Sequence, residues 1–199
     1  MPDARPKPPL RGIQRNDWWL LLHPGFRVPF LALQEEVARI EERAEAGWES
    51  GSKPKLLRRI LDLILKEIPA NPDATTFEQG KTLGADARGW RRAKFLGRFR
   101  LFFRFDSGSK VIVYAWVNDE NTLRERGSAT DPYSVFRGML LAGDPPTNWK
   151  KLLDACRTQE ALSVDQEPGL RLGQLGTMPE APETEPVPPK KRERGRSKR

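Results

Sequence analysis

The sequence predicts an α+β domain, with two N-terminal helices packed on a small twisted antiparallel sheet and further short helices towards the C-terminus. Two segments carry apolar residues three and four positions apart, the spacing of amphipathic helices, and they span residues 30–44 and 57–68. Three later segments alternate in polarity or are rich in β-branched and aromatic residues, as strands are. They span residues 90–95, 98–105 and 110–116. Because only short links join these three strands, we expect an antiparallel meander.

The two predicted helices follow one another without a strand between them. The apolar stripe of the first consists of Phe30, Leu33, Val37, Ile40 and Ala44. The stripe of the second consists of Leu57, Ile60, Leu61, Ile64 and Ile68. Residues 47–54 interrupt the first helix, and Pro69 with Asn71-Pro72 ends the second. We therefore expect a helical hairpin that covers one face of the sheet and leaves the other face open.

Short elements flank this α+β core. An apolar run at residues 18–22, closed by His23-Pro24-Gly25, predicts a strand before the helices. Three short helices are expected after the sheet: residues 119–124, capped by Asn118 and Asp119; residues 132–141, ended by Gly143; and residues 148–157, capped by Thr147.

The chain is expected to have three parts: a flexible N-terminus at residues 1–12, one domain at residues 13–158, and a disordered tail at residues 159–199. The tail carries six prolines and no aromatic residue before its basic end. Such a composition cannot bury enough apolar surface to offset the entropy lost on ordering.

The composition predicts a soluble cytoplasmic protein. No apolar run approaches the length needed to cross a bilayer, and the first residues lack the apolar core of a secretory signal. The single Cys156 excludes an intramolecular disulfide and gives no reason to expect an oxidising compartment.

Positive charge is concentrated in one part of the chain. The formal net charge is +8 at pH 7, and residues 81–104 contain eight basic residues against Asp86 alone. These basic residues are Lys81, Arg88, Arg91, Arg92, Lys94, Arg98, Arg100 and Arg104. A local field of one sign attracts polyanions, so this segment predicts a nucleic-acid-binding surface.

The strongest strand signal, at residues 98–105, also suggests how such a surface is built. Side chains alternate across a strand, so Phe99, Leu101, Phe103 and Phe105 are expected to pack on the core. Arg98, Arg100 and Arg104 are expected to lie on the open face, with Phe102 among them. Guanidinium groups and an exposed ring suit a phosphate backbone with unstacked bases, as in single-stranded RNA.

Several motifs follow one another in an order that resembles one family. They are Trp90 with Arg92 and Lys94-Phe95; residues 97–105; residues 116–124 with Gly127; residues 131–136; and residues 143–146 before Trp149. Upstream, His23-Pro24, Asn71-Pro72 and residues 80–84 also fit. In these motifs, over about residues 18–153, the chain resembles the YhaV toxins. It differs in a longer segment at residues 47–54, a shorter Leu96-Gly97 link and an additional tail.

The resemblance implies a RelE/ParE-like fold and the toxin component of a type II toxin–antitoxin system. It implies an endoribonuclease that needs no metal ion or other cofactor, cleaves mRNA in association with the ribosome, and halts translation. The implied partner is a PrlF-like antitoxin with an AbrB-type domain, and the pair would bind operator DNA.

RNA cleavage without a metal ion uses the 2′-hydroxyl as nucleophile, so the protein must move protons and stabilise a phosphorane. A pair of histidines is impossible because His23 is the only one, whereas a Lys and Arg cluster is available. A lysine crowded by cations has a lowered pKa and can act as acid or base. The candidate catalytic residues are Arg92, Lys94, Arg98, Arg100 and His23. The candidate RNA-binding residues are Lys81, Arg91, Phe102 and Arg104.

Other interpretations of the same residues stay open. The basic strand face could be solvated only, could bind operator DNA in a non-catalytic regulator, or could receive an acidic antitoxin segment. His23 could tie down the corner before Pro24 by hydrogen bonds, and this is favoured over catalysis. Asn118 and Asp119 are favoured as helix caps, and no convincing metal-ligand set is present.

Overall fold

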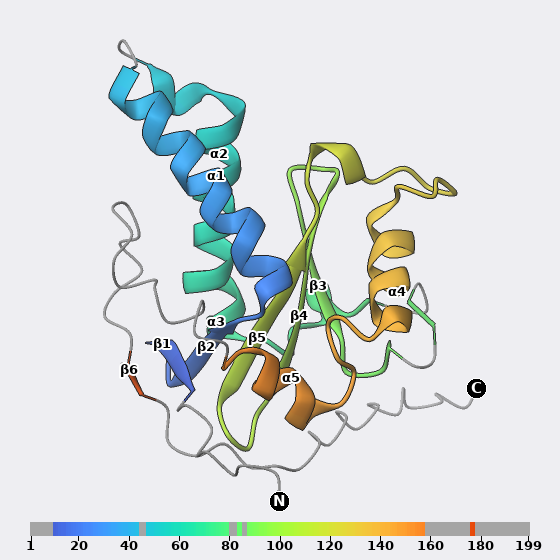
Figure 1. Ribbon diagram of the computed structural model, residues 1–199. Helices are drawn as coiled ribbons and strands as arrows, with labels where there is room; N and C mark the ends of the chain where they lie inside the picture. Colours follow the sequence, from blue (N-terminus) through green and yellow to red (C-terminus); the bar gives the residue numbers. More distant parts are fainter. Residues whose placement is uncertain (1–9, 44–46, 80–82, 85–86, 158–175, 178–199) are drawn as a thin grey trace, which may run out of the picture.

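The computed structural model describes residues 10–43, 47–79, 83–84, 87–157 and 176–177 of the 199 residues. In this part of the chain a central sheet is covered by helices on both faces (Figure 1). The predictions made for residues 1–9, for Lys81 and for most of the tail lie outside the described residues.

The sheet is mixed and its strands are ordered β3-β4-β5-β2-β1-β6. The strands are β1 (Arg11–Arg15), β2 (Trp18–Leu22), β3 (Arg91–Phe95), β4 (Phe99–Asp106), β5 (Val111–Val117) and β6 (Gly176–Thr177). The meander β3-β4-β5 is antiparallel as predicted, but β2 runs parallel to β5. The expected all-antiparallel sheet is therefore wrong. A long helical crossover separates β2 from the meander, and such a connection permits parallel pairing.

The helical hairpin is present, but it is not N-terminal. It consists of α1 (Pro24–Arg43) and α2 (Ser52–Asp62), and the latter continues through a π-helical turn, η2 (Leu63–Glu67), into α3 (Ile68–Ala70). Both β1 and β2 precede it, and β1 begins within the segment expected to be flexible. Asn16 and Asp17, both with positive φ, form the tight turn between these two strands. A short 3-10 turn, η1 (Trp48–Ser50), lies between α1 and α2, and two more follow the hairpin at η3 (Thr75–Phe77) and η5 (Glu120–Thr122).

The second face of the sheet is covered by α4 (Pro132–Ala142) and α5 (Trp149–Ala155) (Figure 1). Asp131 caps α4, Gly143 ends it in the left-handed conformation, and Asn148 rather than Thr147 caps α5. One core layer lies between the sheet and α1–α3, and a second lies between the sheet and α4–α5. The prediction that this face is open is therefore wrong. None of the helices in the described ranges is long and apolar enough to cross a membrane.

A β-bulge between β4 and β5 decides which side chains share this covered face. Phe102 pairs with Trp116 and Phe103 pairs with Tyr114, so one residue of β5 is left over between them. Tyr114 stays in the α1–α3 core, where its hydroxyl donates to the carbonyl of Ile64 at 2.7 Å. The bulge turns Trp116 to the α4 side, where it packs on Phe102.

Candidate nucleic-acid interface

Strand β4 has two faces as predicted, but its arginine face is not a solvent-exposed stripe. Phe99, Leu101, Phe103 and Phe105 lie in or against the α1–α3 core, as expected. On the other face, Phe102 is fully buried, and its ring stacks on Phe136 of α4 with centroids 4.2 Å apart. The prediction that Phe102 is exposed for base stacking is therefore wrong, because α4 occupies its free face.

Arg104 and Arg91 are also buried. Arg104 is 4% exposed, and its Nη1 donates to the carbonyl of Thr147. Its guanidinium lies over Trp90 and Trp149, 5.6 and 5.5 Å from the ring centroids. Arg91 lies on the opposite face and donates to Asp73 at 2.7 Å. Both arginines hold core elements together, so neither has the exposed position that the sequence analysis expected.

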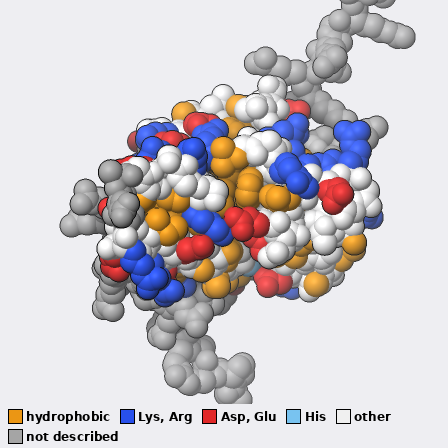
Figure 2. All heavy atoms as spheres, turned by 90° about the horizontal axis from the view of Figure 1, so that it is seen from above, with side chains coloured by type: hydrophobic (Ala, Val, Ile, Leu, Met, Phe, Trp, Pro, Cys, Tyr) orange, Lys and Arg blue, Asp and Glu red, His pale blue; other side chains and the backbone are white. Residues whose placement is uncertain are grey.

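The remaining predicted cations lie together near the turn that connects β3 and β4. Strand register places Lys94 opposite Arg100, with Arg92 two positions earlier on the same face. Arg98 follows in the turn, and Arg124 comes from the segment after η5. We call Arg92, Lys94, Arg98, Arg100 and Arg124 the Lys94 cluster. Figure 2, which views the molecule from the top of Figure 1, shows Lys and Arg side chains in separate groups around hydrophobic side chains, not in one stripe.

Lys94 is the exposed centre of this cluster. Its pKa is lowered from the usual lysine value, mainly by the charge of Arg92, then by partial desolvation, and further by Arg100 and Arg124. Among the described residues, Lys94 has no hydrogen-bond or ion-pair partner. An ammonium group surrounded by like charges and left unpaired can either attract an anion or lose its proton.

The arginines around Lys94 are held mostly by backbone carbonyls, which orient a guanidinium without cancelling its charge. Arg92 Nη1 donates to Thr76 at 3.1 Å, and Arg98 Nε donates to Arg124 at 3.1 Å. Arg100 Nη1 donates to Gly97 at 3.0 Å and to Phe99 at 2.6 Å. Because Arg100 is only 7% exposed, it acts on the surface through its charge more than through free N–H groups.

Asn118 holds β4 and the segment after β5 together beneath the Lys94 cluster. It is 3% exposed, its Oδ1 accepts from the amide of Arg100 at 2.5 Å, and its Nδ2 donates to the carbonyl of Thr122 at 2.8 Å. It therefore joins β4 to η5 and is not itself a helix cap. The cap of η5 is Asp119, whose carboxylate accepts from the amides of Asn121 and Thr122, as predicted.

His23 lies apart from the Lys94 cluster. It follows β2, which is separated from β4 by β5, and its side chain is 1% exposed. Its Nδ1 accepts from the amide of Gly25 at 3.1 Å, and its Nε2 lies 3.3 Å from Asp144. These contacts join the start of α1 to the turn after α4. The structure therefore gives His23 the hydrogen-bonding corner role and does not bring it to the other candidate catalytic residues.

Burial of His23 makes stability depend on pH. Desolvation lowers the pKa of His23 from its usual value, more than the nearby Asp144 carboxylate raises it. Below about pH 6.5 the unfolded chain therefore binds more protons than the folded protein, and the unfolding free energy falls as the pH drops. We expect urea denaturation to show this loss in the wild type. His23→Asn, which keeps an acceptor for Gly25, should weaken the dependence; an unchanged slope between pH 7.5 and 5 would contradict it.

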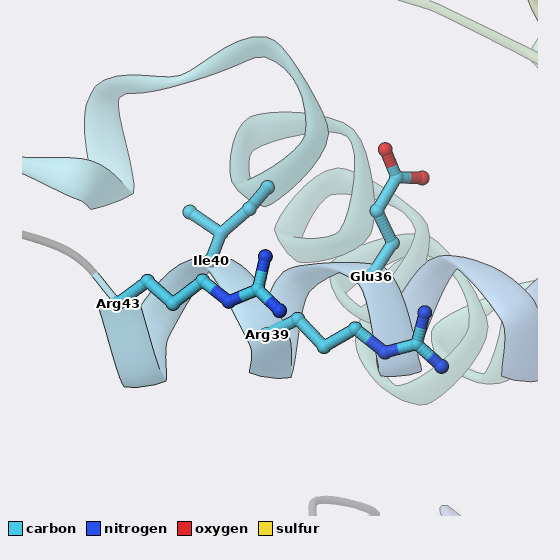
Figure 3. A pocket seen from close by; sticks show the side chains of 4 residues that line it. All are labelled: Glu36, Arg39, Ile40 and Arg43. Carbon is cyan, nitrogen blue, oxygen red and sulfur yellow. The ribbon is translucent and has the colours of Figure 1, made fainter.

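A hollow beside α1 is a separate feature. It is lined by Glu36, Arg39, Ile40 and Arg43, which all come from this one helix (Figure 3). Arg39 pairs with Glu35, and Glu36 pairs with Lys53. Because Arg39 is paired with a carboxylate and a second carboxylate, Glu36, lies in the lining, this hollow is a poorer anion site than the Lys94 cluster.

The described residues contain no group of three or more His, Cys, Asp or Glu side chains arranged to hold a metal ion. Cys156 lies buried in the α4–α5 core, and desolvation raises the pKa of its thiol to about 12, so the group is inert as a nucleophile. Sequence reasoning missed one member of the Lys94 cluster, Arg124. No alternation marks this residue, because it reaches the cluster from a loop rather than from a strand.

Comparison with known proteins identifies relatives over most of the described residues. Residues 20–157 match the family model Toxin_YhaV, described as a toxin with endonuclease activity, of toxin-antitoxin system. The chain is 41% identical over 139 residues to "Toxin YhaV" of Escherichia coli O6:H1 and to "Ribonuclease toxin YhaV" of Escherichia coli K12. Each match covers 69% of this chain and 90% of the relative. No solved structure matches, so the RelE/ParE-like likeness stays a prediction.

Proposed function

Because the chain belongs to the YhaV family, toxins with endonuclease activity of toxin–antitoxin systems, we propose that it cleaves RNA without a metal ion at the Lys94 cluster. The observation that carries this proposal is the unpaired, exposed Lys94 with its lowered pKa. Three of the arginines around it, Arg92, Arg98 and Arg100, are held by neutral carbonyls. The K12 relative is named a ribonuclease toxin, which supports RNA as the substrate.

The proposed chemistry needs a proton carrier and a concentration of positive charge. The 2′-oxygen attacks the adjacent phosphorus, the bond from phosphorus to the 5′-oxygen breaks, and the products carry a 2′,3′-cyclic phosphate and a 5′-hydroxyl. Lys94 transfers a proton to or from the reacting oxygens, and the lowering of its pKa by the neighbouring arginines favours this role. Arg92 and Arg98 stabilise the additional negative charge of the phosphorane.

The partner of such a toxin follows from the family. Toxin–antitoxin membership implies an antitoxin, and we extend the proposal to a PrlF-like partner with an AbrB-type domain that binds operator DNA together with the toxin. We also extend it to mRNA on the ribosome as the physiological substrate and to arrest of translation as the outcome. The exposed cations of the Lys94 cluster support these extensions only through their attraction for polyanions.

The direct test is incubation of the purified protein with RNA in excess EDTA, with and without ribosomes, followed by analysis of the new termini. We expect cleavage with 2′,3′-cyclic phosphate and 5′-hydroxyl ends. RNA in which the 2′-hydroxyl is replaced by hydrogen should remain intact at those positions, because it lacks the nucleophile.

Two outcomes would contradict the proposal. RNA that remains intact under all these conditions, combined with tight, salt-dependent binding of operator DNA, would favour a non-catalytic regulator. Cleavage that stops in EDTA and returns with Mg²⁺, yielding 5′-phosphate ends, would replace the lysine chemistry with a metal-dependent reaction.

A further inference from the structure

We propose that Arg124 contacts a phosphate of the bound polynucleotide and that its guanidinium is held ready for this contact before the polynucleotide arrives. The inference rests on the proposed function in naming RNA as the ligand. It adds a residue that no strand pattern predicted, and it gives the loop after η5 a direct part in binding.

Asp131 holds the Arg124 guanidinium in place, and backbone amides in turn hold the Asp131 carboxylate in place. Asp131 is almost fully buried, and its carboxylate accepts from Arg124 Nη1, from the amide of Glu125 at 3.1 Å and from the amide of Tyr133 at 3.0 Å. The guanidinium also lies over the ring of Tyr133, 5.0 Å from its centroid. An arginine ordered in this way loses little rotamer entropy when it binds a further group.

Reciprocal backbone contacts place Arg124 beside the cluster. Its amide donates to the carbonyl of Arg98 at 3.0 Å, and its own carbonyl accepts from Arg98 Nε at 3.1 Å. The pair joins the loop after η5 to the turn between β3 and β4. Arg124 is also close enough to Lys94 to contribute to the lowered pKa of that side chain.

Part of the Arg124 guanidinium remains free. Its Nη1 bonds to Asp131, but Nε and Nη2 have no protein acceptor among the described residues, and neither atom is buried. A guanidinium that presents two N–H groups on one edge matches the oxygens of a phosphate. In the alternative, Arg124 only links its loop to α4. That role needs the ion pair with Asp131, but it gives no function to the free edge formed by Nε and Nη2.

The experiment measures binding separately from cleavage. A fluorescent 2′-O-methyl RNA, which cannot supply the nucleophile, is titrated with wild type and variants at several salt concentrations. We expect Arg124→Gln to weaken binding roughly tenfold and to lower the slope of log affinity against log salt by about 0.7, the value for one single-stranded phosphate contact. Arg126→Gln is the matched control, because Arg126 is an exposed arginine two residues along the same loop.

Arg124→Lys keeps the charge and can still pair with Asp131, so it covers the case in which Arg124→Gln fails to fold in urea denaturation. It should retain the salt slope and lose several-fold in affinity, because lysine lacks the planar edge. Wild-type affinity and slope in the folded Arg124 variants would overturn the inference, as would an equal loss in Arg126→Gln.

The two proposals fail in different ways. A wild-type protein that binds the 2′-O-methyl RNA through Arg124 but leaves ordinary RNA intact refutes cleavage and supports the contact. A wild-type protein that cleaves ordinary RNA while its Arg124 variants bind unchanged refutes the contact alone. Absence of any RNA binding by the wild type refutes both.

Discussion

Lys94→Gln should slow RNA cleavage by a factor of about 10²–10⁴, the usual range for loss of a general acid or base. Glutamine keeps most of the length of lysine but can neither carry the charge nor transfer the proton. Lys94 is exposed and makes no contact on which the fold depends among the described residues, so the variant should unfold at the same urea concentration as the wild type. Cleavage is measured with the EDTA-treated protein as an initial rate.

Three control variants distinguish proton transfer by Lys94 from the effect of its positive charge. Lys55→Gln, at an exposed lysine on α2, should cleave like the wild type. Lys94→Arg keeps the charge but cannot release a proton near neutral pH, so it should bind RNA normally and cleave slowly. Arg92→Gln removes the largest cause of the lowered Lys94 pKa and should move the corresponding inflection of kcat/KM to higher pH. A normal rate for Lys94→Gln would remove Lys94 from the mechanism.

Phe102→Ala should lower the free energy of unfolding by about 3–5 kcal/mol, the range for removal of a buried aromatic ring. The ring of Phe102 is fully buried and contacts three aromatic residues, Trp116, Tyr133 and Phe136. Its loss leaves a cavity between the sheet and α4 that the neighbouring rings cannot fill without leaving their rotamers. Urea denaturation followed by tryptophan fluorescence measures the change.

A milder variant distinguishes packing from RNA contact. Phe102→Leu should cost less stability, because it refills part of the cavity, and the folded protein should bind 2′-O-methyl RNA with wild-type affinity. If Phe102 stacked on a base instead, either variant would weaken RNA binding by about 1–3 kcal/mol and leave the unfolding midpoint unchanged.

The sequence predicted the local elements of the fold well, because local spacing and turn chemistry determine them. The meander, the helical hairpin and the cap of η5 are confirmed. The pairing of β2 with β5 was missed, since no local pattern specifies which distant strand a short apolar run will join. Strand β1 was missed because Ile13 is its only large apolar residue, although the Asn16-Asp17 pair is a hairpin signal.

The site was predicted in part, for a related reason. Alternation correctly assigned the two faces of β4, but it could not tell a face open to solvent from one covered by a later helix. An arginine such as Arg104 can be buried between two tryptophans, so charge alone did not indicate exposure. Arg92, Lys94, Arg98 and Arg100 do come together, and their shared role stays a prediction.

The parallel pairing of β2 with β5 has a consequence for how this protein is made. Strand β2 ends at residue 22, and its partner on β5 does not begin until residue 111. The helical hairpin, β3 and β4 must therefore all be synthesised after β2 before the centre of the sheet can close. Such high contact order slows folding. We therefore expect a delay between translation of the mRNA and the appearance of folded toxin.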